Sequence, residues 1–445
     1  MSPFGFTPDD EAPDGNQENL NEMMRQMQEQ IAHQFEQLGI NPAGFVNPFA
    51  AFAQGAQDVL PPAVVRDTAK KFVQAHGSQP IGTKDVTVVD NAFEIADLWL
   101  NEATVFPATT GNTSQRAVSR LDWVDETLKG WQATMEPLAT GLSSAISTLL
   151  DEAVAQQSQD ADADNGETMA GPMGAMAGLL RTFIGSLIAT QLGQAIGGIS
   201  ATATGAHDVG LPLLDPARPL LIPENIEKLS EGLEIPKSEI YLFHALREAA
   251  IARLFESNPW LVSYIRSAIV DYGRGIHIDM EAIQRQAEDA MQNFDPLQMN
   301  PESGENSFTI ALNNGIFTPE ETPAQRAALS KLETALALVD GWADEVTNLA
   351  AGDRLPALTQ LREMYRRQRA TSAPSQQLFK SLLGLEVTPK LAREASAFWQ
   401  KIRESKEIAA RDQIWSGILP SAEELLEPEK FLTSSEIPDD LSGLL

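Results

Sequence analysis

Residues 235–260 combine a long helical pattern with charged side chains inside its apolar stripe, and this restricts the fold more than any other stretch. Pro236 and Pro259 bracket the segment, as prolines do near the first turn of a helix and just past its end. At about 100° per residue, His244, Arg247 and Glu248 share one arc with five apolar side chains: Ile240, Phe243, Ile251, Leu254 and Phe255. Unpaired charges in a core cost several kcal/mol each. These three side chains therefore need an opposite charge, a hydrogen-bond network, a metal or a wet cleft.

A second predicted helix brings an acid to its buried side. It opens at Thr322 and Pro323 and runs to about Ala351, with an apolar stripe of Leu329, Leu332, Leu336, Val339 and Ala343. Asp340 lies in that stripe and complements Arg247 or His244. The two patterns together predict a buried polar network of His244, Arg247, Glu248 and Asp340.

The remaining pattern predicts a mainly α fold with many helices and little or no sheet. The one strand candidate is short, at residues 85–89, and Trp399 and Trp415 are expected to anchor the core of the C-terminal helices. We expect a disordered N-terminus at 1–18, an amphipathic helix and connector at 19–61, one helical domain at 62–430 with an acidic linker near 158–168, and a flexible tail at 431–445. Within that linker, DADADNGE resembles a calcium loop but has its glycine and its twelfth residue in the wrong register.

The most apolar stretch, residues 169–200, is predicted to be a buried helix rather than a membrane span. Arg181, Gln191 and Gln194 interrupt it, and its glycines weaken the membrane signal. Small residues recur every four positions and would let another helix approach closely: Gly185, Ala189, Gly193 and Gly197.

Composition limits the partners. The 445 residues include 62 acidic and 32 basic side chains, a formal charge of −30, which disfavours nucleic acid and anionic lipid. The chain has no cysteine and no basic segment followed by an apolar one at its start, so we expect a cytoplasmic protein. The helix at 19–38 either docks on its own domain or recruits a protein partner. The basic cluster Arg362, Arg366, Arg367 and Arg369 is expected to be solvated or paired within the chain.

Several blocks of the sequence carry a resemblance to a known family. In chain order, these blocks are Ala96 to Thr104, Gln191 to Ala195, Gly210 to Leu213, Leu246 to Phe255, Pro259-Trp260, Tyr272 to Ile276, and Val339 to Trp342. Over about residues 62–425 the chain resembles the actinobacterial zincin-like hydrolase family, whose members are labelled zinc-dependent metalloproteases.

The resemblance implies a zinc site on the helix at 235–260. In zincins, two histidines four residues apart bind zinc, and the glutamate after the first activates the metal-bound water. The corresponding segment here reads Arg247-Glu248-Ala249-Ala250-Ile251, so Glu248 is kept as a vestigial general base and both histidines are replaced. The resemblance makes Asp340 the candidate third ligand.

Two hypotheses follow for the function. In the first, the chain is a pseudoenzyme without a metal, and Arg247 supplies the positive charge by pairing with Glu248 or Asp340. In the alternative, it is an active metallohydrolase or peptidase in which Glu248 is the base and His244, Glu248 and Asp340 hold zinc. Whether the chain is an enzyme stays open at this point.

Overall fold

A computed structural model of the chain describes residues 59–110, 115–160, 185–186, 188–276, 322–372, 391–417 and 419–434. Several predicted segments lie outside these ranges, namely residues 1–18, the helix at 19–38, most of the acidic linker near 158–168, and the tail beyond 434.

Helices make up the regular structure of the described residues, as the sequence predicts. They are α3 (Pro62–His76), α4 (Thr83–Ala103), α5 (Arg120–Asp160), α7 (Pro223–Leu229), α8 (Lys237–Ser257), α9 (Pro259–Arg274), α12 (Pro323–Ala351), α13 (Leu358–Ser372), α15 (Ala392–Gln413) and α16 (Pro428–Ser434). Short 3₁₀ turns occur at Gly352–Arg354, Ile414–Ser416 and Glu424–Leu426. Within the described ranges the β pairing consists of isolated bridges from Leu221 to Ala117 and Gly205, so the mainly α class is confirmed.

The short strand expected at residues 85–89 is wrong, because these residues lie in helix α4. The helix starts after Gly82, whose backbone N–H donates to the Asp85 carboxylate at 2.8 Å, one of the hydrogen bonds of a capping box. Buried side chains then recur every three or four residues, at Val89, Phe93, Ala96 and Leu100. This helical spacing outweighs the β-branched residues of the first turns, since strand preference depends strongly on context.

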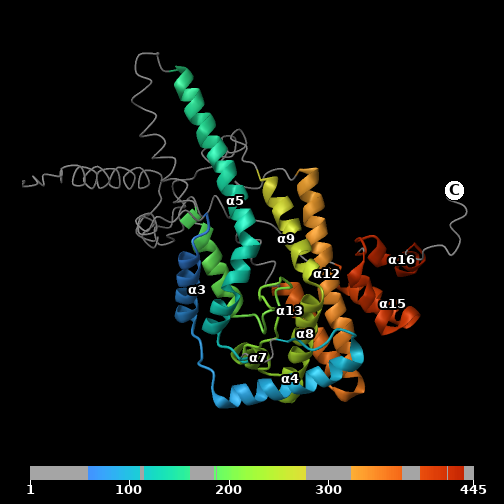
Figure 1. The fold of residues 1–445 in the computed structure, drawn as a ribbon. Helices are drawn as coiled ribbons and strands as arrows, with labels where there is room; N and C mark the ends of the chain where they lie inside the picture. Colours follow the sequence, from blue (N-terminus) through green and yellow to red (C-terminus); the bar gives the residue numbers. More distant parts are fainter. Residues whose placement is uncertain are drawn as a thin grey trace, which may run out of the picture.

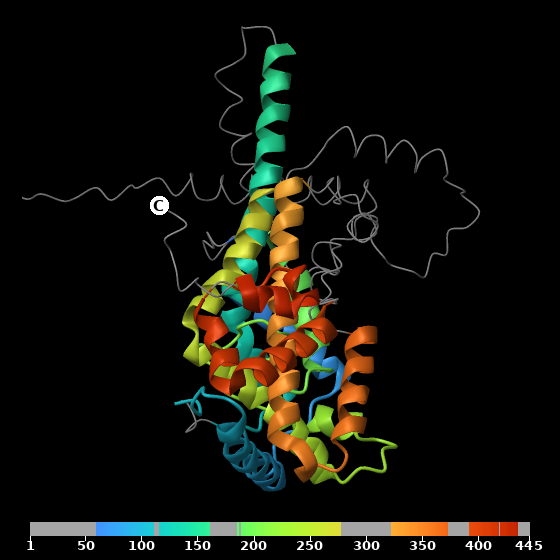
Figure 2. The same ribbon diagram turned by 90° about the vertical axis from the view of Figure 1, so that its right-hand side faces the viewer.

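Helix α8 lies at the centre of the molecule, and every side chain from Ile240 to Phe255 is buried. It packs against α4, α12, α9, α13 and α7. Helices α5, α9 and α12 run alongside one another, and α4 crosses the lower end of the molecule (Figure 1). Helices α15 and α16 lie on the outer side of α12, and the far end of α5 projects beyond its neighbours (Figure 2). The predicted apolar stripe of α8 is therefore too narrow, because the whole circumference of this helix is covered.

The C-terminal helices are anchored by the two predicted tryptophans. Trp399 and Trp415 are both fully buried, and their rings stack with centroids 5.1 Å apart. The Trp399 indole N–H donates to the Leu338 carbonyl at 3.0 Å, which ties α15 to α12. The expectation that these residues anchor the core is confirmed.

Two glycines of the small-residue stripe predicted within 169–200, Gly193 and Gly197, lie against helix α3. A Cβ atom placed on Gly193 would come within 2.7 Å of the Thr68 Cβ and of the Val65 carbonyl oxygen, and one on Gly197 within 2.8 Å of the Phe72 Cβ. Glycine is therefore required at both positions for the two helical segments to approach this closely. No helix in the described part of the chain is long and apolar enough to cross a membrane.

Replacing Gly193 by alanine is expected to lower the free energy of unfolding by about 1–3 kcal/mol, because the added methyl group overpacks the contact with α3. Gly198 is the matched control, since a Cβ there would meet nothing within 4 Å. Gly198→Ala should stabilise the protein by up to about 1 kcal/mol through helix propensity. Urea unfolding of both variants measures the difference, and equal effects would contradict the close approach.

Candidate functional site

Glu248 points from α8 into the loop that runs from residue 203 to residue 222. Its carboxylate accepts hydrogen bonds from the backbone N–H groups of Ala206 at 2.9 Å, His207 at 3.0 Å and Leu220 at 3.3 Å. The Nδ1 atom of His207 lies 2.9 Å from Oε1 and is the donor there, because a carboxylate only accepts. Four donors therefore surround a carboxylate that is 4% exposed.

The loop fits around this carboxylate because residue 205 is a glycine. A Cβ atom on Gly205 would lie 2.4 Å from Oε2 of Glu248, much closer than any normal contact. The Gly205 carbonyl accepts a hydrogen bond from the Trp123 indole N–H at 3.0 Å, which attaches the loop to α5. Glu248 thus holds the loop to the central helix.

Arg247 points in another direction, toward α12 and α13. Its Nη2 atom donates to Asp340 Oδ1 at 2.5 Å, and Nη1 lies 3.7 Å from Asp344 Oδ1. The guanidinium carbon lies 4.1 Å from the centroid of the Tyr365 ring, a cation–π arrangement. Burial lowers the pKa of Arg247, but Tyr365, Asp340 and Asp344 raise it by more, so the pKa ends above its ordinary value. The side chain stays charged.

Asp344 pairs with two arginines of the basic cluster on α13. Arg362 donates to it through Nε at 3.0 Å and Nη2 at 2.7 Å, and Arg366 donates at 2.8 Å. Burial raises the pKa of Asp344, but Arg362, Arg247 and Arg366 together hold it well below its usual value. Arg367 pairs with Glu363 on the same helix, and Arg369 lies 3.9 Å from Asp208. The predicted pairing of these arginines within the chain is confirmed.

His244 lies on the side of α8 that faces Tyr365 of α13. The two rings meet at a steep angle with centroids 6.4 Å apart, and the Tyr365 hydroxyl donates to Asp208 at 3.0 Å. Burial lowers the pKa of His244 to about 4, and the Arg247 charge also lowers it, against the opposite effect of Asp208. The imidazole is therefore neutral at pH 7, and its buried Nε2 atom has no partner in the described part of the chain.

The structure separates the four residues of the predicted network into two groups. Arg247 and Asp340 contact each other directly, whereas Glu248 turns to the loop and pairs with His207. His244, Glu248 and Asp340 do not converge, and the described residues contain no group of three or more His, Asp or Glu side chains that could hold a metal.

Sequence reasoning missed several residues of this site, namely His207, Asp208, Asp344 and Tyr365. His207 lies in a loop 41 residues before Glu248 and belongs to no periodic pattern that would have paired them. Asp344 follows Asp340 by one helical turn on α12, and that spacing could have indicated it as a second acid facing α8.

Comparison with known proteins places this arrangement in a family. The sequence matches the family model described as zincin-like metallopeptidase over residues 62–432. The chain belongs to the zincin-like metallopeptidase family. It is also similar to a crystal structure described as "a putative hydrolase with a novel fold" from Chloroflexus aurantiacus, with a TM-score of 0.55 and 16% identity over 85% of this chain and 100% of that one. This likeness concerns the fold. No curated protein matches the chain.

On the mapping that the resemblance implies, the residues at the two ligand positions, Arg247 and Ile251, do not fit a zinc ion. At the first ligand position, Arg247 offers only donors and a positive charge that is already bound to Asp340. At the second ligand position, Ile251 has a hydrocarbon side chain, which cannot bind a metal. The remaining oxygen donors of Glu248 are directed at the N–H groups of the loop. The structure supports a network of charges and hydrogen bonds at the motif of this zincin-like protein.

Replacing Arg247 by methionine should lower the free energy of unfolding by about 3–5 kcal/mol, because it removes the buried guanidinium that pairs with the partly buried Asp340. Arg367 provides the control. It forms an exposed ion pair with Glu363 within one helix, so Arg367→Met should cost less than about 0.5 kcal/mol. Denaturant unfolding of the two variants tests the contrast, and a small effect at Arg247 would show that its pairing contributes little.

The low pKa of His244 predicts a loss of stability in mild acid. An unfolded histidine binds its proton near pH 6.5, whereas folded His244 does so only near pH 4. Stability is therefore complete above pH 6.5 and falls as the pH drops toward 4, by up to about 3 kcal/mol. His244→Phe should make the unfolding midpoint depend less on pH between pH 6.5 and 4.5. Parallel curves for both proteins would contradict this account. The buried Asp208 and Asp344, whose pKa values are lowered, affect both proteins only at lower pH.

Proposed function

We propose that this zincin-like metallopeptidase homologue is a pseudoenzyme, which acts as a binding or structural protein. The observation that carries the proposal is the position of Glu248. A general base must reach the water from which it takes a proton, but this carboxylate is buried and accepts three backbone N–H groups and one imidazole N–H. Its lone pairs serve to hold the loop at 203–222.

The ion pair of Arg247 with Asp340 supports the same conclusion. It stands at the motif position where a zincin carries its first metal ligand, and it balances the charge of Asp340 without a metal. Planar guanidinium groups are well suited to such buried pairing because they stay charged and donate in a fixed geometry. A zinc ion bound to Asp340 would have to displace this partner.

One observation favours the alternative, a metallohydrolase that uses Glu248 as base with zinc on His244, Glu248 and Asp340. His244 is neutral at pH 7, and its buried Nε2 atom lacks a partner in the described residues, so a nitrogen suited to bind a metal is present. Bringing Asp340 and Glu248 to that atom would require breaking both the pair with Arg247 and the hydrogen bonds to the loop.

The variant Glu248→Gln separates the two functions. If Glu248 is structural, the amide NH₂ group faces donor N–H groups, and each donor left unpaired costs about 1–3 kcal/mol of stability. Glu234→Gln is the control, because Glu234 is an exposed glutamate just before α8 and should tolerate the change within about 0.5 kcal/mol. Thermal and urea unfolding give the measurement.

Metal content provides the opposing test. The proposal expects the purified full-length protein to contain no stoichiometric zinc by elemental analysis, and its unfolding midpoint to be the same with and without a chelator. About one zinc per chain that is lost in His244→Ala or Asp340→Ala, together with peptide hydrolysis that Glu248→Gln abolishes while stability is unchanged, would overturn the proposal.

A further inference from the structure

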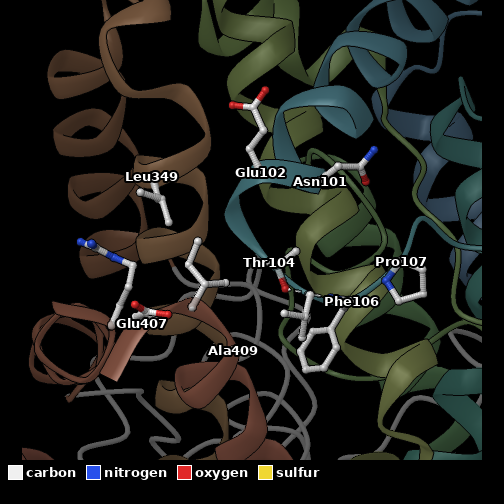
Figure 3. A pocket seen from close by; sticks show the side chains of 11 residues that line it. Asn101, Glu102, Thr104, Phe106, Pro107, Leu349, Glu407 and Ala409 are labelled. Carbon is white, nitrogen blue, oxygen red and sulfur yellow. Dashed lines mark hydrogen bonds between the residues drawn. The ribbon is translucent and has the colours of Figure 1, made fainter. Parts of the chain in front are cut away.

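A pocket of about 790 Å³ lies between α4, α12 and α15, and it shares no residue with the network around Glu248 and Arg247. Figure 3 shows Leu349 of α12 with Glu407 and Ala409 of α15 along one side, and the end of α4 with the residues that follow it, Thr104, Phe106 and Pro107, along the other. Its apolar lining includes Val105, Phe106, Leu349 and Ile408. The opening is bordered by charged side chains, among them Glu102 and Glu407.

Glu407 breaks helix α15 at the edge of this pocket. Its backbone has φ 72° and ψ 175°, a conformation that is essentially restricted to glycine. The break is fixed from both sides. On the N-terminal side, Arg403 pairs with the buried Glu345 at 2.5 Å. On the C-terminal side, the buried Arg411 donates to the Ala103 carbonyl at 2.7 Å.

The Glu407 carboxylate is exposed and has no hydrogen bond or ion pair among the described residues. The other charged groups of the pocket are occupied, because Arg403 is bound to Glu345 and Glu102 is bound to Arg354 at 3.1 Å. The walls are also well supported, since the Asp412 carboxylate accepts from the Thr104 hydroxyl and the Val105 N–H. A strained backbone at an unpaired acidic residue beside a pocket is typical of a residue that contacts a ligand.

The apolar lining continues onto the exposed surface. Val105 is 56% exposed, and on α4 Leu98 and Ile95 are 66% and 40% exposed. Leu98 lies one helical turn from Glu102, which lines the pocket, so the exposed apolar side chains lead into it. Exposed apolar residues that adjoin a pocket with a charged edge mark sites of protein recognition.

We propose that this pocket binds a segment of a partner protein in which an apolar side chain is followed closely by lysine or arginine. The apolar side chain enters between Val105, Phe106 and Ile408, and the cationic group pairs with Glu407. The net charge of −30 favours a basic partner and opposes a second copy of this chain, because two copies repel each other. This inference rests on the binding role proposed above and gives that role a partner class.

The test selects binders from a random peptide library displayed on phage, with the full-length protein as target. The enriched peptides should share an apolar residue within two positions of lysine or arginine. Their affinity, measured by fluorescence anisotropy with synthetic labelled peptides, should fall about tenfold for Glu407→Gln, as expected for loss of a hydrogen bond to a charged group. Glu404→Gln is the matched control, because Glu404 is exposed on the same helix outside the pocket, and it should keep full affinity.

A second variant keeps the test independent of folding. Glu407→Gly should raise the unfolding midpoint, since glycine adopts this conformation without strain, and at the same time it should weaken peptide binding. Enriched peptides without a basic residue, unchanged affinity in both Glu407 variants, or a stable dimer in sedimentation that Leu98→Asp dissociates would overturn the inference. All of these are binding measurements with Glu248 intact, so their failure is distinct from zinc content or hydrolysis at Glu248.

Discussion

The burial of α8 on all sides governs the rest of the structure. A helix covered by five neighbours leaves no direction in which a polar side chain can reach bulk water, and each such side chain must find its partner inside the protein. Arg253 finds Asp97 and Asn101 on α4, at 2.9 Å each. Arg247 donates to Asp340 on α12, and Glu248 accepts from backbone N–H groups of the loop at 203–222. The charged residues of one helix therefore position three separate parts of the chain.

On the proposal that the metal motif is degenerate, this arrangement explains how the scaffold is held together without the two histidines. In a metal site, a zinc ion would attach the motif helix to the helix that supplies the third ligand. Here the guanidinium of Arg247 joins α8 to α12 through Asp340 and stacks on Tyr365 of α13. The same two helices are held together, with α13 added, and the strength of the contact depends on a permanent charge instead of a bound ion.

The sequence predicted those features that depend on spacing along one helix. The bounds of α8 and α12 follow from prolines and apolar periods, and the pairing of Arg247 with an acid on α12 follows from charges placed in two apolar stripes. Contacts that depend on the path of a loop were not predictable. The hydrogen bonds of Glu248 join residues 28 to 42 positions apart through an irregular segment, and nothing in the residues around Glu407 indicates the break in α15. The strand predicted at 85–89 was wrong because it rested on the strand preference of its β-branched residues, whereas the packing of α4 favours a helix there.

The interior of the protein contains paired charges, although the chain as a whole carries a large negative net charge. The fully buried basic side chains, including Arg253 and Arg411, are arginines paired with carboxylates or carbonyls of the same chain. Each such ion pair uses one acidic and one basic side chain, so the excess of 62 acidic over 32 basic residues remains for the rest of the chain. An excess of this size predicts long-range repulsion of nucleic acid and of a second copy of the chain. In the complex proposed above, long-range attraction comes from basic groups on the partner, and short-range attraction from the apolar side chains beside Glu407 that are exposed among the described residues.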